Sequence, residues 1–363
     1  EHMGKNISGQ NYTPYHMHSM ISNGVTNIDS ITNFRLYVEA AKNCGMKAMA
    51  FSEHGCIFEW LHKKEAIEKA GMKYIHAVEA YITEDPKNKV RDNYHCVLIA
   101  KNYDGFLELN ELVSKSFNRA SVKAIDDEVR FYYMPRITYA ELEKTSDNII
   151  VTTACLGGIL SKAGPELKNR FICFLKKNKH RCFLEIQHHN DTAGAQKEYN
   201  QKLYRISQEI DVPLITGTDT HALNDLHMKG RSILQKAKDV YFADEESWDM
   251  TFKTYEELVA AYEKQGSLPM DVVLEAIENT NRMADMVEEF EIDRSYKYPH
   301  LWPDPMKTFR EKIEAGIKRR GVDKFPNYQE YLDRVEYETE AYVHNGAIDF
   351  MLLMEDIIDW CNH

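Results

Sequence analysis

The stretch Tyr15-His16-Met17-His18-Ser19 decides the fold, because it opens a series of predicted strands that end in metal-binding side chains. Residues i and i+2 of a strand point to the same side, so His16 and His18 can face one metal ion. In a chain with 15 histidines such a pair is a weak signal by itself. It gains weight because later strands end in the same kind of residue.

Outward from this stretch, short apolar runs alternate with amphipathic helical ones. The apolar runs predict strands that follow the first one, at residues 47–51, 74–82, 96–100, 148–152, 182–187 and 213–216. Between them, apolar residues at helical spacing predict helices at residues 33–44, 57–70, 105–117, 166–177 and 196–209. This alternation predicts an α/β fold with about seven strands, of the barrel type that carries its chemistry at the carboxyl ends of its strands.

One connection breaks the βα rhythm. The link from Thr83 to Asn93 is charged, contains a proline and is barely long enough for a helical crossover. We therefore expect the strand at 96–100 to run antiparallel to its neighbours. His95, which opens that strand, then lies at the rim where the parallel strands end.

Eight side chains at or just past strand ends are candidate metal ligands: His16, His18, His54, Glu79, His95, Cys155, Asp219 and His221. Imidazole, carboxylate and thiolate suit Zn, Mn or Fe better than Mg or Ca, and eight ligands suit two or three ions. Taken singly, Cys155 reads as a buried packing residue and His95 as a surface histidine. Glu79 resists such a reading, because an unpaired carboxylate inside a barrel is costly.

After about residue 222 the predicted strands stop. Helical patterns cover residues 255–264 and 272–290, and prolines 299, 303 and 305 indicate a linker. Further helices are predicted at 328–344 and 349–360, with a break at Gly346. We expect a metal-binding barrel over residues 1–222, its helical extension over 223–298 and a separate helical segment over 306–363.

Composition excludes several classes of protein. The hydrophobic fraction of 43% and the net charge of −12 indicate an ordinary globular chain with no overall attraction to nucleic acid. The seven cysteines form no C-x-x-C pair, which favours the reducing cytoplasm over a disulfide framework. No apolar run approaches the roughly 20 residues that cross a bilayer, so we expect no membrane association.

Several motifs together resemble the polymerase and histidinol phosphatase (PHP) family, in the version at the N-terminus of bacterial replicative DNA polymerase III alpha subunits. They are His16-Met17-His18-Ser19, Ser52-Glu53-His54-Gly55, Val78-Glu79-Ala80-Tyr81, His95, Ala154-Cys155-Leu156-Gly157-Gly158 and Asp219-Thr220-His221. The resemblance implies a distorted seven-stranded barrel that holds up to three metals on nine ligands. Cys155, the run at 102–106 and the segment 334–360 are similar to polymerase traits. The chain ends before the palm carboxylates that the resemblance places further on, so as it stands we do not expect it to polymerise DNA.

The ninth ligand is a departure from the family pattern. The family has an acidic residue or a histidine shortly after the H-x-H pair, where this chain has Asn23. Asn27-Ile28-Asp29-Ser30 looks like the acidic ligand motif displaced by about four residues. We expect Asp29 to fill the position, with Asn23 as the alternative.

These features predict metal-dependent phosphodiester hydrolysis, as a 3′-5′ proofreading exonuclease in DNA replication. Two or three ions, Zn or Mn with Fe or Mg as alternatives, would activate water. His54, His95 and His221 complete the ligand set, and one of them would protonate the leaving oxygen. Glu185 and His188 are expected behind the ligands, with His188 and His189 also candidates for phosphate contact.

The resemblance implies three kinds of partner: a DNA primer 3′ end, the rest of a polymerase chain and replisome subunits. Two other functions stay open. In some relatives the domain has lost ligands and is a scaffold, and in others it is a stand-alone small-molecule phosphatase.

Overall fold

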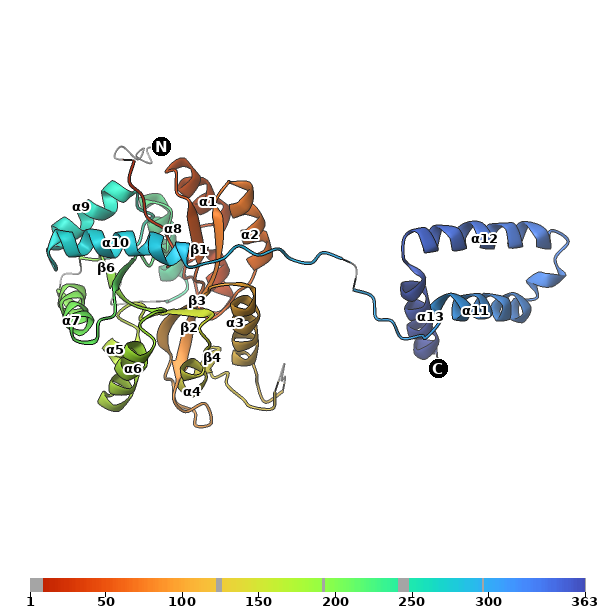
Figure 1. Ribbon diagram of the computed structural model, residues 1–363, viewed down its shortest axis with the longest axis horizontal. Helices are drawn as coiled ribbons and strands as arrows, with labels where there is room; N and C mark the ends of the chain where they lie inside the picture. Colours follow the sequence, from red (N-terminus) through yellow and green to blue (C-terminus); the bar gives the residue numbers. More distant parts are fainter. Residues whose placement is uncertain (1–8, 122–125, 191–192, 241–247, 296, 363) are drawn as a thin grey trace. The chain divides into compact units, whose positions relative to one another are not determined.

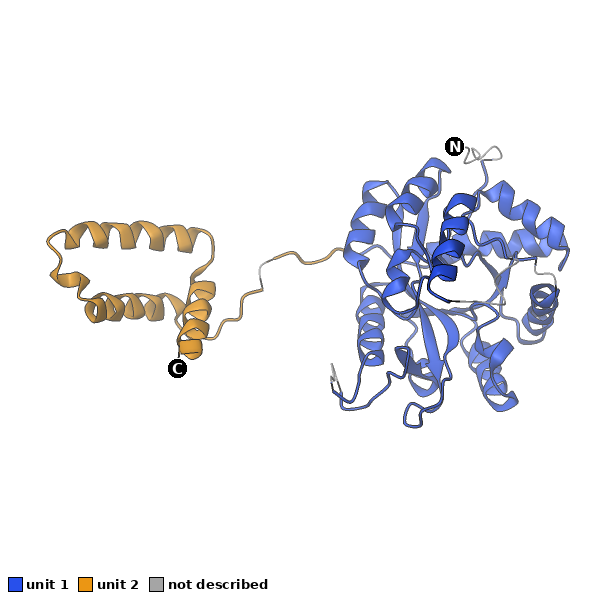
Figure 2. Cartoon of the chain, turned by 180° about the vertical axis from the view of Figure 1, so that it is seen from behind, with its two compact units in different colours: residues 1–290 blue, residues 291–363 orange. Residues whose placement is uncertain are grey.

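The computed structural model describes residues 9–121, 126–190, 193–240, 248–295 and 297–362. These residues form two compact units, 1–290 and 291–363, coloured separately in Figure 2. Unit 1 contains every candidate ligand.

A seven-stranded sheet forms the centre of unit 1 (Figure 1), in the order β1-β2-β3-β5-β6-β7, with β4 paired to β2. The strands are β1 (Ala48–Phe51), β2 (Lys73–Thr83), β3 (Tyr94–Ala100), β4 (Arg136–Thr138), β5 (Ile149–Thr152), β6 (Cys182–Gln187) and β7 (Leu214–Gly217). The helices between the strands are α1 (Phe34–Asn43), α2 (Trp60–Lys69), α3 (Tyr103–Ser116), α4 (Tyr139–Glu143), α5 (Ile159–Lys162), α6 (Pro165–Lys177) and α7 (Ala195–Ile210). The α/β prediction is confirmed.

β3 is antiparallel to both of its neighbours, β2 and β5, as the short link before it predicts. The other named strand pairs are parallel. Because β3 runs backwards, its first residues lie where the parallel strands end, and Tyr81 of β2 is opposite His95. The reversal therefore brings His95 to the rim with the other candidates.

The segment 14–18 lies between the edge strands β1 and β7 and closes the curled sheet. On one side its carbonyls accept hydrogen bonds from the Ala50 and Ser52 amides, at 2.9 and 3.0 Å. On the other side the segment exchanges two backbone hydrogen bonds with Thr220, at 2.8 and 3.2 Å. The sequence predicts a strand here, whereas the structure has a single bridge at Met17, because the segment pairs only briefly with each neighbour.

The interior of the barrel is filled by alternate residues of the strands. Small and branched side chains such as Ala48, Ala50 and Ile75 are fully or almost fully buried there. Helix α10 (Met270–Asp285) packs at the amino ends of the strands, where Met283 joins the same cluster and Asn279 donates to the Leu214 carbonyl. Burial of this core stabilises the fold by about 25 cal/mol per Å² of apolar surface removed from water.

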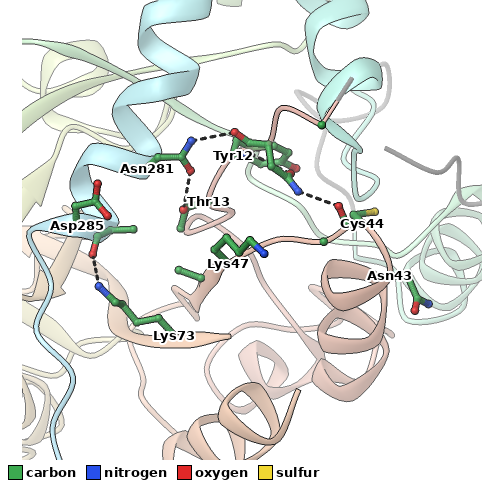
Figure 3. Close-up of a pocket in the computed structure, with 13 residues that line it drawn as sticks. Tyr12, Thr13, Asn43, Cys44, Lys47, Lys73, Asn281 and Asp285 are labelled. Atoms are coloured by element: carbon green, nitrogen blue, oxygen red, sulfur yellow. Dashed lines mark hydrogen bonds between the residues drawn. The ribbon is translucent and has the colours of Figure 1, made fainter. Parts of the chain in front are cut away.

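A cavity of about 700 Å³ lies at this amino end, beside α10 (Figure 3). Its polar groups mostly fasten neighbouring segments together: Thr13 donates to the Asn281 side chain at 3.2 Å, and Lys73 to the Ala284 carbonyl at 3.0 Å. No candidate metal ligand lines it. The cavity is thus separate from the end of the barrel where the ligands gather.

The sequence missed some elements and shifted others. The stretch 118–147, predicted as a polar loop, contains β4 and α4, which are too short for a periodic signal. α2 begins at Trp60 rather than Ile57, because Glu59 before it has a left-handed backbone with φ of 60°. The extension of unit 1 contains α8 (Asp225–Ala237), which was not predicted, and α9 (Tyr255–Gln265), which matches the helix predicted at 255–264.

Unit 2 is built from α11 (Pro305–Arg320), α12 (Tyr328–His344) and α13 (Ile348–Asn362). Pro305 occupies the first turn of α11, where its missing N–H costs nothing. Leu352 of α13 is buried, but Ile358 and Trp360 are exposed. Among the described helices, none has the length and apolar character needed to cross a bilayer.

Candidate metal centre

The candidate ligands form three groups of atoms at the carboxyl rim. Within each group the potential donor atoms lie within 4.8 Å of one another. The groups are His18, Asp29, His54 and His221; His16, His18 and Asp219; and Glu79, His95 and Cys155. All nine predicted positions are therefore brought together, although their role as ligands stays a prediction.

Glu79 lies between the groups, as the hub of the centre. Its Oε1 is 2.8 Å from His95 Nδ1 and 3.4 Å from His16 Nε2. Its Oε2 is 2.8 Å from His54 Nδ1 and 3.4 Å from His18 Nε2. Glu79 is therefore a residue that would help hold divalent cations together with the surrounding imidazoles.

Asp219 and Asp29 supply the other two carboxylates. Asp219 Oδ1 is 3.1 Å from His18 Nε2 and 3.3 Å from His16 Nε2. Asp29 Oδ1 is 3.1 Å from His54 Nε2 and 3.3 Å from His221 Nε2. Each aspartate thus lies against two imidazoles, as in the shell of a metal ion.

Buried polar atoms without a hydrogen bond test whether the residues fit a metal. Atoms of this kind are His16 Nε2, His18 Nε2, His54 Nδ1, Asp29 Oδ2, Glu79 Oε2 and Asp219 Oδ1. Several of them lie 2.8–3.4 Å from one another without hydrogen-bond geometry, and a cation shared by these atoms would satisfy them together. Nitrogen and carboxylate atoms of this type are donors for divalent metal ions, and the set fits a cluster of them.

The pKa shifts follow from burial and from the mixture of charges. Burial and the neighbouring imidazoles of His54 and His221 lower the pKa of His18 to about 4, so its ring is neutral and able to bind a metal. Burial opposes ionisation of Glu79 as well, but the imidazoles of His95 and His54 hold the pKa of its carboxyl well below the usual range. The centre therefore presents charged carboxylates beside imidazole ligands.

The backbone is strained at three positions that aim the ligands. Ile28, Ala154 and Asp219 have positive φ, at 49°, 54° and 46°. Side chains other than glycine rarely adopt this region, and for a β-branched residue such as Ile28 it is an outlier. Strain of this kind persists where the surrounding structure imposes it. Here the strained residues are those directly before Asp29 and Cys155, and Asp219 itself.

Glu185 stands behind His16, as the sequence predicts for an orienting residue. Its Oε1 is 2.6 Å from His16 Nδ1, which leaves Nε2 to face the centre. Its Oε2 accepts hydrogen bonds from the hydroxyls of Tyr15 at 2.6 Å and Thr152 at 3.1 Å. Gly217 is required beside it, because a Cβ there would lie 2.1 Å from Glu185 Oε1.

Asp29 and Asn23 have different positions. The Asp29 carboxylate is buried in the centre, whereas Asn23 is exposed. The Asn23 side chain accepts hydrogen bonds from the amides of Asp29 at 2.7 Å and Ser30 at 3.2 Å. Asn23 thus holds the loop that presents Asp29.

His188 and His189 lie outside the three groups. His188 is buried and its Nε2 is 3.2 Å from the Asp249 carbonyl. The His189 ring stacks on Trp248 with centroids 4.9 Å apart. Neither position tests the prediction that His188 supports a metal ligand, or that His188 and His189 contact phosphate.

Glu53 was assigned no role from the sequence, although it is part of the motif around His54. Glu53 is buried and accepts hydrogen bonds from Ser19, Ser22 and Lys63. Together these residues hold the loops after the first two strand ends in register. Ser19 and Ser22, which are spaced three apart after the H-x-H pair, are the sequence feature that could have indicated this network.

A comparison with protein families matches residues 14–189 to the model of the PHP domain. The chain carries a PHP domain. The matched range begins at the segment that closes the barrel and includes the first seven predicted ligands in chain order.

Almost the whole chain, including the residues after the PHP domain, also matches part of larger proteins. The chain is 29% identical to DNA polymerase III subunit alpha of Borreliella burgdorferi, over 96% of this chain and 30% of the relative. It is 28% identical to the protein of the same name from Aquifex aeolicus, over 97% of this chain and 31% of the relative. The chain thus spans about a third of the length of these relatives.

Among solved structures, the PHP domain is similar to a two-domain protein from Bacteroides vulgatus that contains a predicted PHP-like metal-dependent phosphoesterase. The TM-score is 0.35 at 13% identity, and the match covers 70% of this chain and 63% of the other.

Proposed function

We propose that the PHP domain is a metal-dependent phosphodiester hydrolase that removes nucleotides from a DNA 3′ end. One observation carries the proposal: six buried polar atoms without hydrogen bonds, from residues far apart in sequence, meet at one mouth of the barrel. The homology to DNA polymerase III subunit alpha supports DNA as the substrate and proofreading as the purpose.

Divalent ions held at the three groups, Zn or Mn in this proposal, supply water activation and neutralise charge on the phosphate. Glu185 fixes the ring of His16, so that Nε2 faces the centre in the metal-binding orientation. Burial excludes bulk water from His16, His18 and Glu79, which strengthens every charge interaction at the phosphate.

His95 is the residue that we assign to the leaving oxygen. Its side chain is 22% exposed, compared with 9% for His54 and 4% for His221. It can therefore reach a substrate at the mouth while its Nδ1 stays 2.8 Å from Glu79. A proton transferred from its ring would neutralise the departing 3′ oxygen.

The domain assignment belongs to the same proposal. Residues 1–222 are the metal-binding barrel, 223–298 its helical extension, and 306–363 a segment that leads towards a polymerase palm. The partners are the primer 3′ end, the rest of the polymerase and replisome subunits, in the cytoplasm.

The test is a nuclease assay on the purified chain. A single-stranded oligonucleotide labelled at its 5′ end is incubated with Mn²⁺, Zn²⁺ or Mg²⁺. We expect a ladder of products shortened from the 3′ end, and at least a hundredfold slower release by a chain with His16→Ala and Asp219→Ala. The folded state of this variant is checked by its circular dichroism.

Equal release by the folded double variant would eliminate the enzyme proposal and leave a scaffold. Turnover of histidinol phosphate with no release from DNA would favour a small-molecule phosphatase instead.

A further inference from the structure

Aromatic rings and arginines gather on the loops beside the metal centre. We call Arg91, Arg119, Phe131, Tyr132 and Tyr133 the Tyr133 surface. The Arg91 guanidinium lies 4.2 Å from the centroid of the Tyr133 ring, and the Arg119 guanidinium lies 3.9 Å from that of Phe131. The Tyr132 and Tyr133 rings are edge to face with centroids 4.7 Å apart.

This surface is continuous with the mouth of the barrel. The Tyr81 ring is parallel to the His54 ring, with centroids 5.9 Å apart. Pro135 lies so close to Gly55, the neighbour of His54, that a Cβ on Gly55 would be 2.7 Å from the proline ring. β4 begins opposite Tyr81, and Tyr81 pairs on its other side with His95, so the loop before β4 reaches the sheet at the level of His95.

Tyr133 is held outward rather than packed. Its side chain is 62% exposed, and its backbone has a left-handed φ of 59°, which is strained for a tyrosine. The turn around it is fixed by the bridge between Tyr132 and Met134. A large exposed ring on a strained backbone costs stability unless a ligand packs against the ring.

The positive charges of the Tyr133 surface are also available to bind an anion. Within the described part of the chain, neither Arg91 nor Arg119 forms an ion pair. Arg130 nearby differs, because Asp126 and Glu141 hold its guanidinium at 2.7 and 2.8 Å. The two arginines on the rings are therefore the ones free to meet an anion.

We propose that the Tyr133 surface binds the unpaired nucleotides of single-stranded nucleic acid whose end lies in the metal centre. The proposal rests on the proposed function and names the extended strand, rather than a small phosphomonoester, as the substrate. Exposed aromatic faces stack on any base, and guanidinium groups contact the phosphates between the bases. Arg91 contributes both charge and a planar face over the Tyr133 ring.

Binding is measured without catalysis, by fluorescence anisotropy of a labelled oligo-dT 12-mer with the full chain in EDTA. Stacking of one base on a ring leads us to expect about tenfold weaker binding by Tyr133→Ala. Tyr133→Phe keeps the ring and should bind within about twofold of the wild type. Both variants keep a side chain at the strained position, so the backbone strain is matched.

Tyr337 provides a control from unit 2. It is 65% exposed and the Arg334 guanidinium lies 5.3 Å from its ring centroid, so it is an exposed tyrosine with an arginine over its ring that is not part of the Tyr133 surface. We expect Tyr337→Ala to leave the affinity unchanged. Arg91→Ala should lower the salt dependence of binding by about one phosphate contact, a slope change of roughly 0.7.

Absence of binding by the wild type, or equal binding by Tyr133→Ala, would overturn the proposal. So would an equal loss in Tyr337→Ala. Because the assay contains EDTA, a failure here is separate from a failure of hydrolysis: strong binding with no nuclease activity under any metal would refute the proposed function alone.

Discussion

Two buried carboxylates on adjacent strand ends, Glu53 and Glu79, have opposite surroundings. Their backbones are joined, since the Glu79 amide donates to the Glu53 carbonyl at 3.1 Å. Glu53 accepts hydrogen bonds from the Ser19 amide at 2.9 Å, from the Ser22 hydroxyl at 2.6 Å and from Lys63 Nζ at 2.6 Å. Glu79 faces imidazoles instead, and its Oε2 has no hydrogen bond.

The difference separates a structural carboxylate from a candidate metal ligand. Both are buried, so burial alone does not separate them. The Glu53 network is complete without anything else, and one lysine balances its charge. The Glu79 region has more donors and acceptors aimed inward than it can pair, which is the condition that a metal ion relieves.

The largest expected effect is a loss of stability when the Glu53 network is disrupted. Lys63→Met leaves a buried carboxylate without its cation, so we expect the free energy of unfolding to fall by about 3–5 kcal/mol, with or without metal. Urea denaturation measures it. Lys115→Met is the control on another helix, because Lys115 is partly exposed and pairs with the exposed Glu111, and it should cost about 0–1 kcal/mol. Equal losses in the two variants would contradict the account.

The second effect breaks the Glu79 side. At a Mn²⁺ concentration 100 times the dissociation constant, binding should stabilise the wild type by about 2.7 kcal/mol relative to EDTA. In Glu79→Gln we expect most of this gain to vanish, whereas Lys63→Met should retain it. Thermal unfolding with and without metal measures the gain. A full metal response in Glu79→Gln would show that Glu79 is no ligand.

The third effect concerns Glu185, which lies behind His16, and its influence on metal affinity. Glu185→Gln keeps the size of the side chain but weakens its hold on His16 Nδ1, so metal affinity should fall about 10- to 100-fold. Isothermal titration with Mn²⁺ measures it. Tyr15→Phe, which removes one hydrogen bond to Glu185, should weaken binding less. An unchanged affinity in Glu185→Gln would show that orientation of His16 is immaterial.

The smallest effect is a pH dependence. Burial opposes ionisation of Glu53, but Lys63 and the serine hydroxyls hold its pKa below the ordinary value of 4.5. A carboxyl with a depressed folded pKa stabilises the protein above its unfolded pKa, and this stability is lost as pH falls through the folded pKa. In EDTA, unfolding free energy should thus fall with acid below about pH 4.5 in the wild type, and this contribution should shrink in Lys63→Met. Equal acid slopes in the two proteins would contradict the assignment.

Much of the fold could be predicted because strand runs such as Cys182–Gln187 are apolar and isolated between helical patterns. The short link at 83–93 even gave the reversed strand. The three-residue β4 could not be recognised, and the closing segment 14–18 was predicted as a strand although it pairs only briefly, since pairing with distant neighbours rather than local propensity defines both.

The candidate site was predictable where ligands directly follow strands, as His54 and Asp219 do. Asn23 was weighed only as a ligand, and its hold on the Asp29 loop depends on the loop's folded path. The Glu53 network was invisible for the same reason, because Lys63 reaches it from a helix. Residues such as Lys63 and Asn23, which reach their partners only through the folded path of the chain, have no periodic spacing relative to the candidate ligands.

The most direct measurement is the metal content of the purified chain after equilibration with Mn²⁺ and removal of free ions, by inductively coupled plasma mass spectrometry. The account predicts two or three ions per wild-type chain, unchanged in Lys63→Met and less than one in Glu79→Gln. A wild type with no bound ions, or a Glu79→Gln protein with the full complement, would contradict it.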